Sequence, residues 1–154
     1  GSLVMQSDLL QRNYSYVVVA VGTGCTFAGL RMTLPESVTL VGVAALKGAW
    51  VQREMLRRMH SYPKQGWYLD SDHHFGGFGR VDPALLSFIA EFGDNTGLAL
   101  DPIYTGKAMI ALRDLIVDSV IPCGSRVLFV HSGGLQGRRG YPSNTLSKSH
   151  FSSE

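Results

Sequence analysis

The chain has 154 residues and a formal net charge of +2, because 14 Lys and Arg residues nearly balance 12 Asp and Glu residues. A balance this close disfavours a protein that binds nucleic acid by neutralising its phosphates. Hydrophobic residues make up 45% of the chain and charged residues 17%, which excludes disorder as the main state and predicts one globular domain with a hydrophobic core.

The first part of the chain predicts a strand, a loop, a helix and a second strand. Residues 16–21 (YVVVAV) form an apolar, β-branched run without alternation, which is typical of a parallel strand buried on both faces. A Gly/Thr-rich loop follows at 22–26, and a helix is expected over 27–33. Pro35 ends that helix before a second apolar run at 38–43.

The middle of the chain predicts two amphipathic helices separated by a loop. Residues 49–59 place apolar side chains on one side and charged ones on the other. The glycines and aromatics of 61–80 predict mostly loop, with a short strand at 67–69. Asp82 and the proline after it favour a helix start, and Gly93 is expected to end that helix.

The last part predicts a short strand at 98–100 after a turn at 94–97, a helix over 104–120 and a buried strand at 126–130. Strands that alternate with helices imply an α/β protein, a three-layer sandwich with a mostly parallel sheet. Residues 1–4 are predicted to be a tag or linker remnant, 5–140 the α/β domain and 141–154 a polar tail.

Cysteine usage and hydropathy set expectations for the cellular setting. Cys25 and Cys123 are the two cysteines, so the fold needs no disulfide framework and a reducing, cytoplasmic setting is expected. No apolar run approaches the roughly 20 residues of a membrane span, so no membrane association is expected. The pair His73 and His74 lacks accompanying Cys, Asp or Glu at ligand spacing, so no metal site is predicted.

The loop Gly22-Thr23-Gly24-Cys25-Thr26 is the strongest candidate binding site. It offers successive backbone N–H groups, two hydroxyls and a following helix N-terminus, a combination that suits a phosphate group. A third glycine and an acidic residue needed for dinucleotide binding are missing, and no Walker-type lysine follows. A single small phosphate group is therefore favoured, although an ordinary strand-to-helix turn would have the same composition.

Two later segments carry polar groups that can reach the same edge of the sheet, where ligands bind in such folds. Tyr104 and Thr105 lie at the start of a predicted helix, and His131-Ser132-Gly133-Gly134 follows the last predicted strand. Taken singly, Tyr104 fits a packing role and the Gly-rich segment fits a turn.

Four motifs in this order, GTGCTFAGL, HFGGFGR, DPIYTGKAM and HSGGLQG, resemble the carboxyl-terminal half of the family that contains D-cysteine desulfhydrase and 1-aminocyclopropane-1-carboxylate (ACC) deaminase. The resemblance spans roughly residues 16–140. It implies the fold of the pyridoxal-phosphate enzymes similar to the tryptophan synthase β subunit, incomplete relative to the full family fold. It also implies pyridoxal phosphate as cofactor and a small amino acid as substrate.

The resemblance assigns roles to particular residues. It implies that Gly22, Thr23, Gly24, Cys25 and Thr26 hold the cofactor phosphate, and that Tyr104 and Ser132 line the substrate pocket. Thr105 would face the pyridine nitrogen, where deaminases have Glu, and Ser132 replaces the Leu typical of deaminases. Both positions favour D-cysteine desulfhydrase chemistry, α,β-elimination from a small D-amino acid.

Two departures bear on activity. Phe78 stands where the family motif supplies a second active-site tyrosine, and Phe cannot transfer a proton. The family's cofactor-linking lysine lies in its amino-terminal half, so we expect the isolated chain to be inactive. The alternative is a non-catalytic module that binds a phosphate-bearing metabolite. In either case we expect a homo-oligomer or a complementing amino-terminal half to cover apolar surface.

Overall fold

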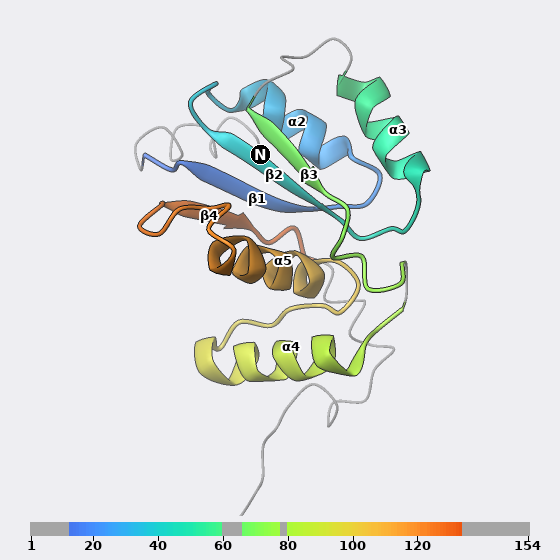
Figure 1. Cartoon of the computed structure of the whole chain (residues 1–154), viewed down its shortest axis with the longest axis vertical. Helices are drawn as coiled ribbons and strands as arrows, with labels where there is room; N and C mark the ends of the chain where they lie inside the picture. Colours follow the sequence, from blue (N-terminus) through green and yellow to red (C-terminus); the bar gives the residue numbers. More distant parts are fainter. Residues whose placement is uncertain (1–12, 60–65, 78–79, 134–154) are drawn as a thin grey trace, which may run out of the picture.

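The computed structural model describes residues 13–59, 66–77 and 80–133 (Figure 1). Within these ranges lie four strands and four helices. Their order is β1 (Tyr16–Val21), α2 (Cys25–Thr33), β2 (Thr39–Ala44), α3 (Ala49–Met59), β3 (Trp67–Asp70), α4 (Pro83–Thr96), α5 (Thr105–Val117) and β4 (Val127–Val130). The structure confirms an α/β fold.

The four strands form one sheet in the order β3-β2-β1-β4, and every pairing among them is parallel. In the register, Val18 of β1 lies beside Val41 of β2 on one side and Phe129 of β4 on the other. Residues 17–19 of β1 have no exposed surface. The β-branched run predicted from the sequence is therefore an interior strand of a sheet covered on both faces.

Helices cover both faces of this sheet (Figure 1). On one face α2 and α3 pack over Val17, Val19 and Val21 through a cluster that includes Phe27 and Met55. On the other face α5 packs over Val18, Val41 and Val43. Helix α4 lies outside α5, and their contact buries Leu85, Ile89 and Ile110. The expected three layers are present, with α4 added on the outside.

Arg31 is a buried cation that the sequence did not reveal. Its guanidinium donates hydrogen bonds to the carbonyls of Leu34, Pro35, Val38 and Gly66 at 2.6–2.9 Å. Burial lowers the pKa of Arg31, and the charge of Glu36 opposes that shift. The contacts join the end of α2 to the segments that lead into β2 and β3.

The structure corrects three predicted helix boundaries. Helix α2 begins at Cys25 rather than at residue 27, and α5 ends at Val117 rather than at 120 because Ser119 adopts a positive φ of 59°. The predicted helix end at Gly93 and the turn predicted at 94–97 are wrong. Helix α4 continues to Thr96, and Gly97 is its C-cap, with a φ of 71° that suits glycine.

The short strand predicted at 98–100 is also absent, because this segment has no partner strand and instead buries Leu100 between α4 and α5. The predicted segments 1–4 and 141–154 and the Phe78 position lie outside the described residues.

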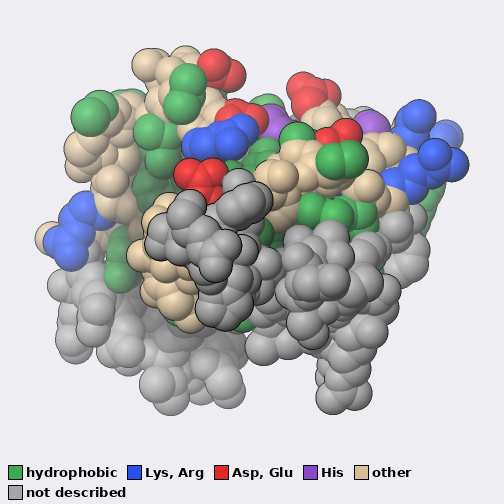
Figure 2. Space-filling model, turned by 90° about the horizontal axis from the view of Figure 1, so that it is seen from below, with side chains coloured by type: hydrophobic (Ala, Val, Ile, Leu, Met, Phe, Trp, Pro, Cys, Tyr) green, Lys and Arg blue, Asp and Glu red, His purple; other side chains and the backbone are tan. Residues whose placement is uncertain are grey.

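Charged side chains of both signs lie beside one another on the face that carries α4 (Figure 2). None of the described helices is long and apolar enough to cross a membrane.

We predict that Gly42→Ala destabilises the fold by about 1–3 kcal/mol, because a Cβ on Gly42 would lie 2.5 Å from Phe27 Cε2 and 2.8 Å from Val21 Cγ2. Gly29→Ala is the matched control, since nothing lies within 4 Å of its Cβ and the site is inside α2. It should raise stability by up to about 1 kcal/mol. Urea denaturation measures both, and equal effects of the two changes would contradict the packing described here.

Candidate functional site

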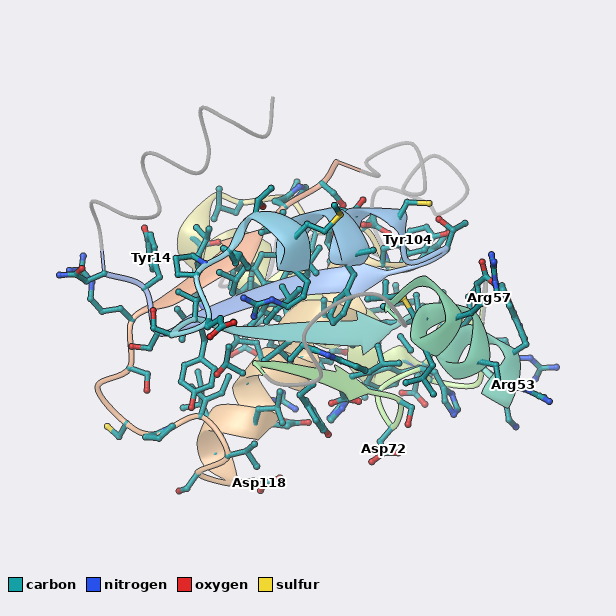
Figure 3. The ribbon with its side chains drawn as sticks, turned by 90° about the horizontal axis from the view of Figure 1, so that it is seen from above. Tyr14, Arg53, Arg57, Asp72, Tyr104 and Asp118 are labelled. Carbon is teal, nitrogen blue, oxygen red and sulfur yellow. The ribbon has the colours of Figure 1, made fainter. Side chains whose placement is uncertain are left out.

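A cleft of about 310 Å³ lies at the carboxyl end of the sheet, between β1 and β4. The chain runs from β1 outward to β2 and β3 and then returns to the opposite side of β1 as β4. The loops after β1 and β4 therefore diverge at this point, which is where open α/β sheets bind ligands. The cleft is lined by residues 20–27, Tyr104, Ser132 and Gly133. Figure 3 shows Tyr104 at this end of the sheet and Tyr14 at the other.

Two glycines shape the loop after β1. Gly24 adopts a φ of 86° immediately before α2, and a Cβ there would overlap the sulfur of the buried Met55. A Cβ on Gly22 would lie 3.2 Å from Cε1 of Tyr104, so the tyrosine ring rests against this glycine. The loop thus packs closely on both sides and presents its polar groups to the cleft.

The N-terminus of α2 opens into the cleft and carries no side-chain cap. The starts of α4 and α5 differ, because Asp82 accepts a hydrogen bond from Ala84 N and Asp101 accepts several from the start of α5. An uncapped helix start with its positive dipole end is a site for an anion. Thr23 and Thr26, both exposed, add two hydroxyls to the same loop.

Asp101 is fully buried and organises the start of α5. Its carboxylate accepts hydrogen bonds from the backbone N–H groups of Ile103 at 2.9 Å, Tyr104 at 2.7 Å and Thr105 at 3.0 Å. These bonds fix the backbone at Tyr104, whose ring reaches the loop after β1. Tyr104 and the loop after β1, which are far apart in the sequence, thereby line the same cleft.

Thr105 lies away from the cleft lining. It has only 1% exposed surface, its hydroxyl donates to the Asp101 carboxylate, and that hydroxyl accepts from Asp101 N at 2.8 Å. A role for Thr105 beside the cofactor stays a prediction. The other predicted site residues, Gly22 to Thr26, Tyr104 and Ser132, all line the one cleft.

The loop after β4 is tied to the segment before α5. His131 Nε2 lies 2.9 Å from the Ala99 carbonyl, and Gly133 N donates to His131 Nδ1 at 3.3 Å. Together these contacts assign the proton to Nε2, because a carbonyl can only accept and a backbone N–H can only donate. The histidine holds the loop that brings Ser132 and Gly133 to the cleft.

Lys107 is a buried functional group that sequence reasoning left unassigned. It has no exposed surface, and its ammonium donates to the carbonyls of His74 at 2.9 Å and Gly77 at 2.8 Å, with Ala45 O at 3.5 Å. Burial lowers the pKa of Lys107, and the charge of Asp101 opposes that shift. Sequence alone shows a lysine early in a helix, a position that is usually exposed.

His73 joins the turn after β3 to α5. Its Nδ1 lies 2.7 Å from the buried Asp70 carboxylate and its Nε2 lies 3.2 Å from Asp114. A hydrogen bond from Arg113 lowers the pKa of Asp114, burial opposes this, and the His73 contact adds to the lowering. Among the described residues, no group of three or more His, Cys, Asp or Glu side chains is arranged to hold a metal ion.

The fold and the cleft define an α/β protein with a parallel sheet and a cleft at its switch point, lined by the uncapped start of α2. The chain is 31% identical to a protein of Pyrococcus horikoshii named as a candidate ACC deaminase, over 96% of this chain and 47% of that protein. It is 30% identical to the D-cysteine desulfhydrase of Klebsiella pneumoniae, over 78% of this chain and 40% of that protein.

A crystal structure of an ACC deaminase homologue matches with a TM-score of 0.74 and 27% identity, over 94% of this chain and 48% of that one. No family model matches the sequence. The chain belongs to the family of ACC deaminases and D-cysteine desulfhydrases. It spans about half the length of the curated relatives it matches.

We predict that Asp101→Ala destabilises the fold by about 3 kcal/mol, because three backbone N–H groups and the Thr105 hydroxyl lose a buried acceptor. Asp82→Ala is the control, since this exposed carboxylate caps α4 through one bond to Ala84 N. It should cost about 1 kcal/mol. Chemical denaturation compares the two variants, and a smaller loss for Asp101→Ala than for Asp82→Ala would refute the role given to Asp101.

A pH dependence follows from the lowered pKa of Asp114. The stabilisation from its ionised form is present above the pKa of the carboxyl in the unfolded chain and is lost as pH falls through the lower folded pKa. We therefore expect Asp114→Asn to be less stable than the parent at neutral pH, with the difference shrinking toward acid. Thermal midpoints measured from pH 7 downward test this, and a difference that grows in acid would contradict it.

Proposed function

We propose that the cleft binds the phosphate of pyridoxal phosphate and that the chain supplies this part of the site to an enzyme acting on a small amino acid. The observation that carries the proposal is the uncapped start of α2, which opens on a cleft at the switch point of the sheet. Membership of the family supports the choice of pyridoxal phosphate among phosphate-bearing ligands.

The residues present fit the cofactor's phosphate. The lining residues offer backbone N–H groups and the hydroxyls of Thr23, Thr26 and Ser132, and none of them is Asp or Glu. A phosphate dianion would therefore meet donors without a repelling carboxylate. The left-handed backbone at Gly24 turns the chain from β1 into α2 and directs the first N–H groups of the helix toward the cleft.

Pyridoxal phosphate, when bound, supplies an electron sink that stabilises negative charge on the substrate's α-carbon. Within the proposed site, the Tyr104 ring lies against Gly22 and so flanks whatever the loop holds. Its hydroxyl can hold or move a proton at Oη. Ser132, exposed beside the cleft, can donate a hydrogen bond to a substrate carboxylate.

We further propose that the substrate class is closer to that of D-cysteine desulfhydrases than to that of ACC deaminases. Thr105 occupies the position where deaminases carry Glu, and its hydroxyl is engaged with the Asp101 carboxylate. Because that hydroxyl is buried against Asp101 and lies outside the cleft lining, this position offers a bound pyridine ring no carboxylate to keep it protonated. The expected reaction of the whole enzyme is α,β-elimination from a small D-amino acid.

A second candidate is a module that binds a phosphate-bearing metabolite without catalysis. Amide and hydroxyl donors recognise the phosphate itself, whatever molecule carries it. The two candidates share the loop and differ in whether the pyridine ring adds affinity through Tyr104. Comparing ligands with and without the ring therefore separates them.

The test is calorimetric titration of the full chain with pyridoxal phosphate, pyridoxal and inorganic phosphate. We expect saturable binding of pyridoxal phosphate and none of pyridoxal, since the phosphate carries the interaction. Thr23→Asp should weaken binding about tenfold or more by placing a carboxylate in the loop. Ser87→Asp, the same charge change on the exposed side of α4, should leave affinity unchanged.

Each outcome decides between the candidates. Equal affinity for inorganic phosphate and pyridoxal phosphate would favour the metabolite-binding module over the cofactor site. Binding of pyridoxal as tight as that of its phosphate, or equal weakening by Thr23→Asp and Ser87→Asp, would overturn the assignment of the loop.

A further inference from the structure

The ammonium of Lys107 sits in a cage of backbone carbonyls contributed by separate parts of the chain. Ala45 O directly follows β2, whereas His74 O and Gly77 O belong to the turn after β3. Each of these groups is an acceptor. Among the described residues, no acceptor side chain is hydrogen-bonded to Nζ, and Asp101 acts on it as a nearby charge.

This arrangement has the chemistry of a binding site for a small cation. Converging carbonyl dipoles place negative partial charge around one point. The His74 carbonyl also accepts from Gly77 N at 2.9 Å, and the Gly77 carbonyl from Arg80 N at 3.3 Å, so both turn a second lone pair toward Nζ. An ammonium group provides three donors and the charge at once. The side chain of Lys107 extends from the first turn of α5 and places its ammonium at that point.

The cage lies next to the groups that shape the cleft. Ala45 N donates to Val21 O at 3.0 Å, and Val21 is a cleft residue at the end of β1. Lys107 itself follows Tyr104 by three positions, in the turn of α5 that Asp101 anchors. The ammonium therefore joins the end of β2, the turn after β3 and the start of α5.

We propose that the carbonyls of Ala45, His74 and Gly77 form a monovalent-cation site of the ammonium type, that Lys107 fills it as a built-in cation, and that this contact positions the cleft. Lys107 is a positioning residue in this proposal. The inference stands independently of the ligand proposed above, because it concerns the chain alone.

Removing the side chain while restoring the charge from solution tests the proposal. Lys107→Ala should lower the thermal midpoint by roughly 10 °C, because the variant loses the buried ammonium and its hydrogen bonds to carbonyls of separate segments. Ammonium or methylammonium chloride should recover a large part of this loss. Tetramethylammonium chloride at the same ionic strength should not, because that ion has equal charge but no N–H donor and is too large for the cage.

Lys107→Met is the second variant. Its unbranched chain fills the space of the lysine stem and leaves no room for an added cation, so we expect a loss of stability that ammonium does not recover. Amide NMR signals provide a second measurement. In Lys107→Ala the signals of Gly22 and Tyr104 should move from their parental positions and return when ammonium is added.

Several results would overturn the proposal. These are an unchanged midpoint in Lys107→Ala, equal recovery by tetramethylammonium, recovery of Lys107→Met by ammonium, or Gly22 and Tyr104 signals that do not respond. If Lys107→Ala does not fold in ordinary buffer, refolding is repeated in ammonium chloride. Refolding there but not in tetramethylammonium chloride supports the cation site, and failure in both salts counts against it.

Discussion

The buried carboxylate of Asp101 is the interaction on which the cleft depends. It holds the N–H groups that lead into α5, and this fixes Tyr104 immediately before the helix and Lys107 in its first turn. One of these side chains rests on the loop after β1, and the other reaches the carbonyls beyond β2 and β3. The Asp101 carboxylate thus fixes the position of α5 against the carboxyl edge of the sheet, where the cleft lies.

The starts of α2, α4 and α5 differ in how their backbone N–H groups are capped. Aspartates satisfy the starts of α4 and α5, while the start of α2 is left without a side-chain cap where it opens on the cleft. An uncapped start is less stable by itself, and its place beside a cleft at the switch point is why we propose that a bound phosphate completes it. Stability given up locally is a common feature of binding sites.

Local patterns predicted much of this architecture, and long-range contacts explain the remainder. The apolar run of β1, the Asp82 cap and the Gly/Thr loop are signals carried by neighbouring residues. The structure confirms the strand and the helix start, and the loop lines the cleft while its binding role stays a prediction. The strand predicted at 98–100 failed because pairing depends on a neighbour that no local pattern specifies. Lys107 is held by carbonyls of distant segments, and Arg31 by three nearby carbonyls and the distant one of Gly66, so the burial of these cations had no sequence signal.

The proposal that the cleft holds a phosphate-bearing cofactor rests on the start of α2 and on membership of the deaminase and desulfhydrase family. The most direct test of that central claim is an amide NMR titration of the full chain with pyridoxal phosphate. We predict that the largest shifts fall on Gly22 to Thr26, with further shifts at Tyr104 and Gly133. Shifts centred on another part of the molecule, with these amides unmoved at saturation, would contradict it.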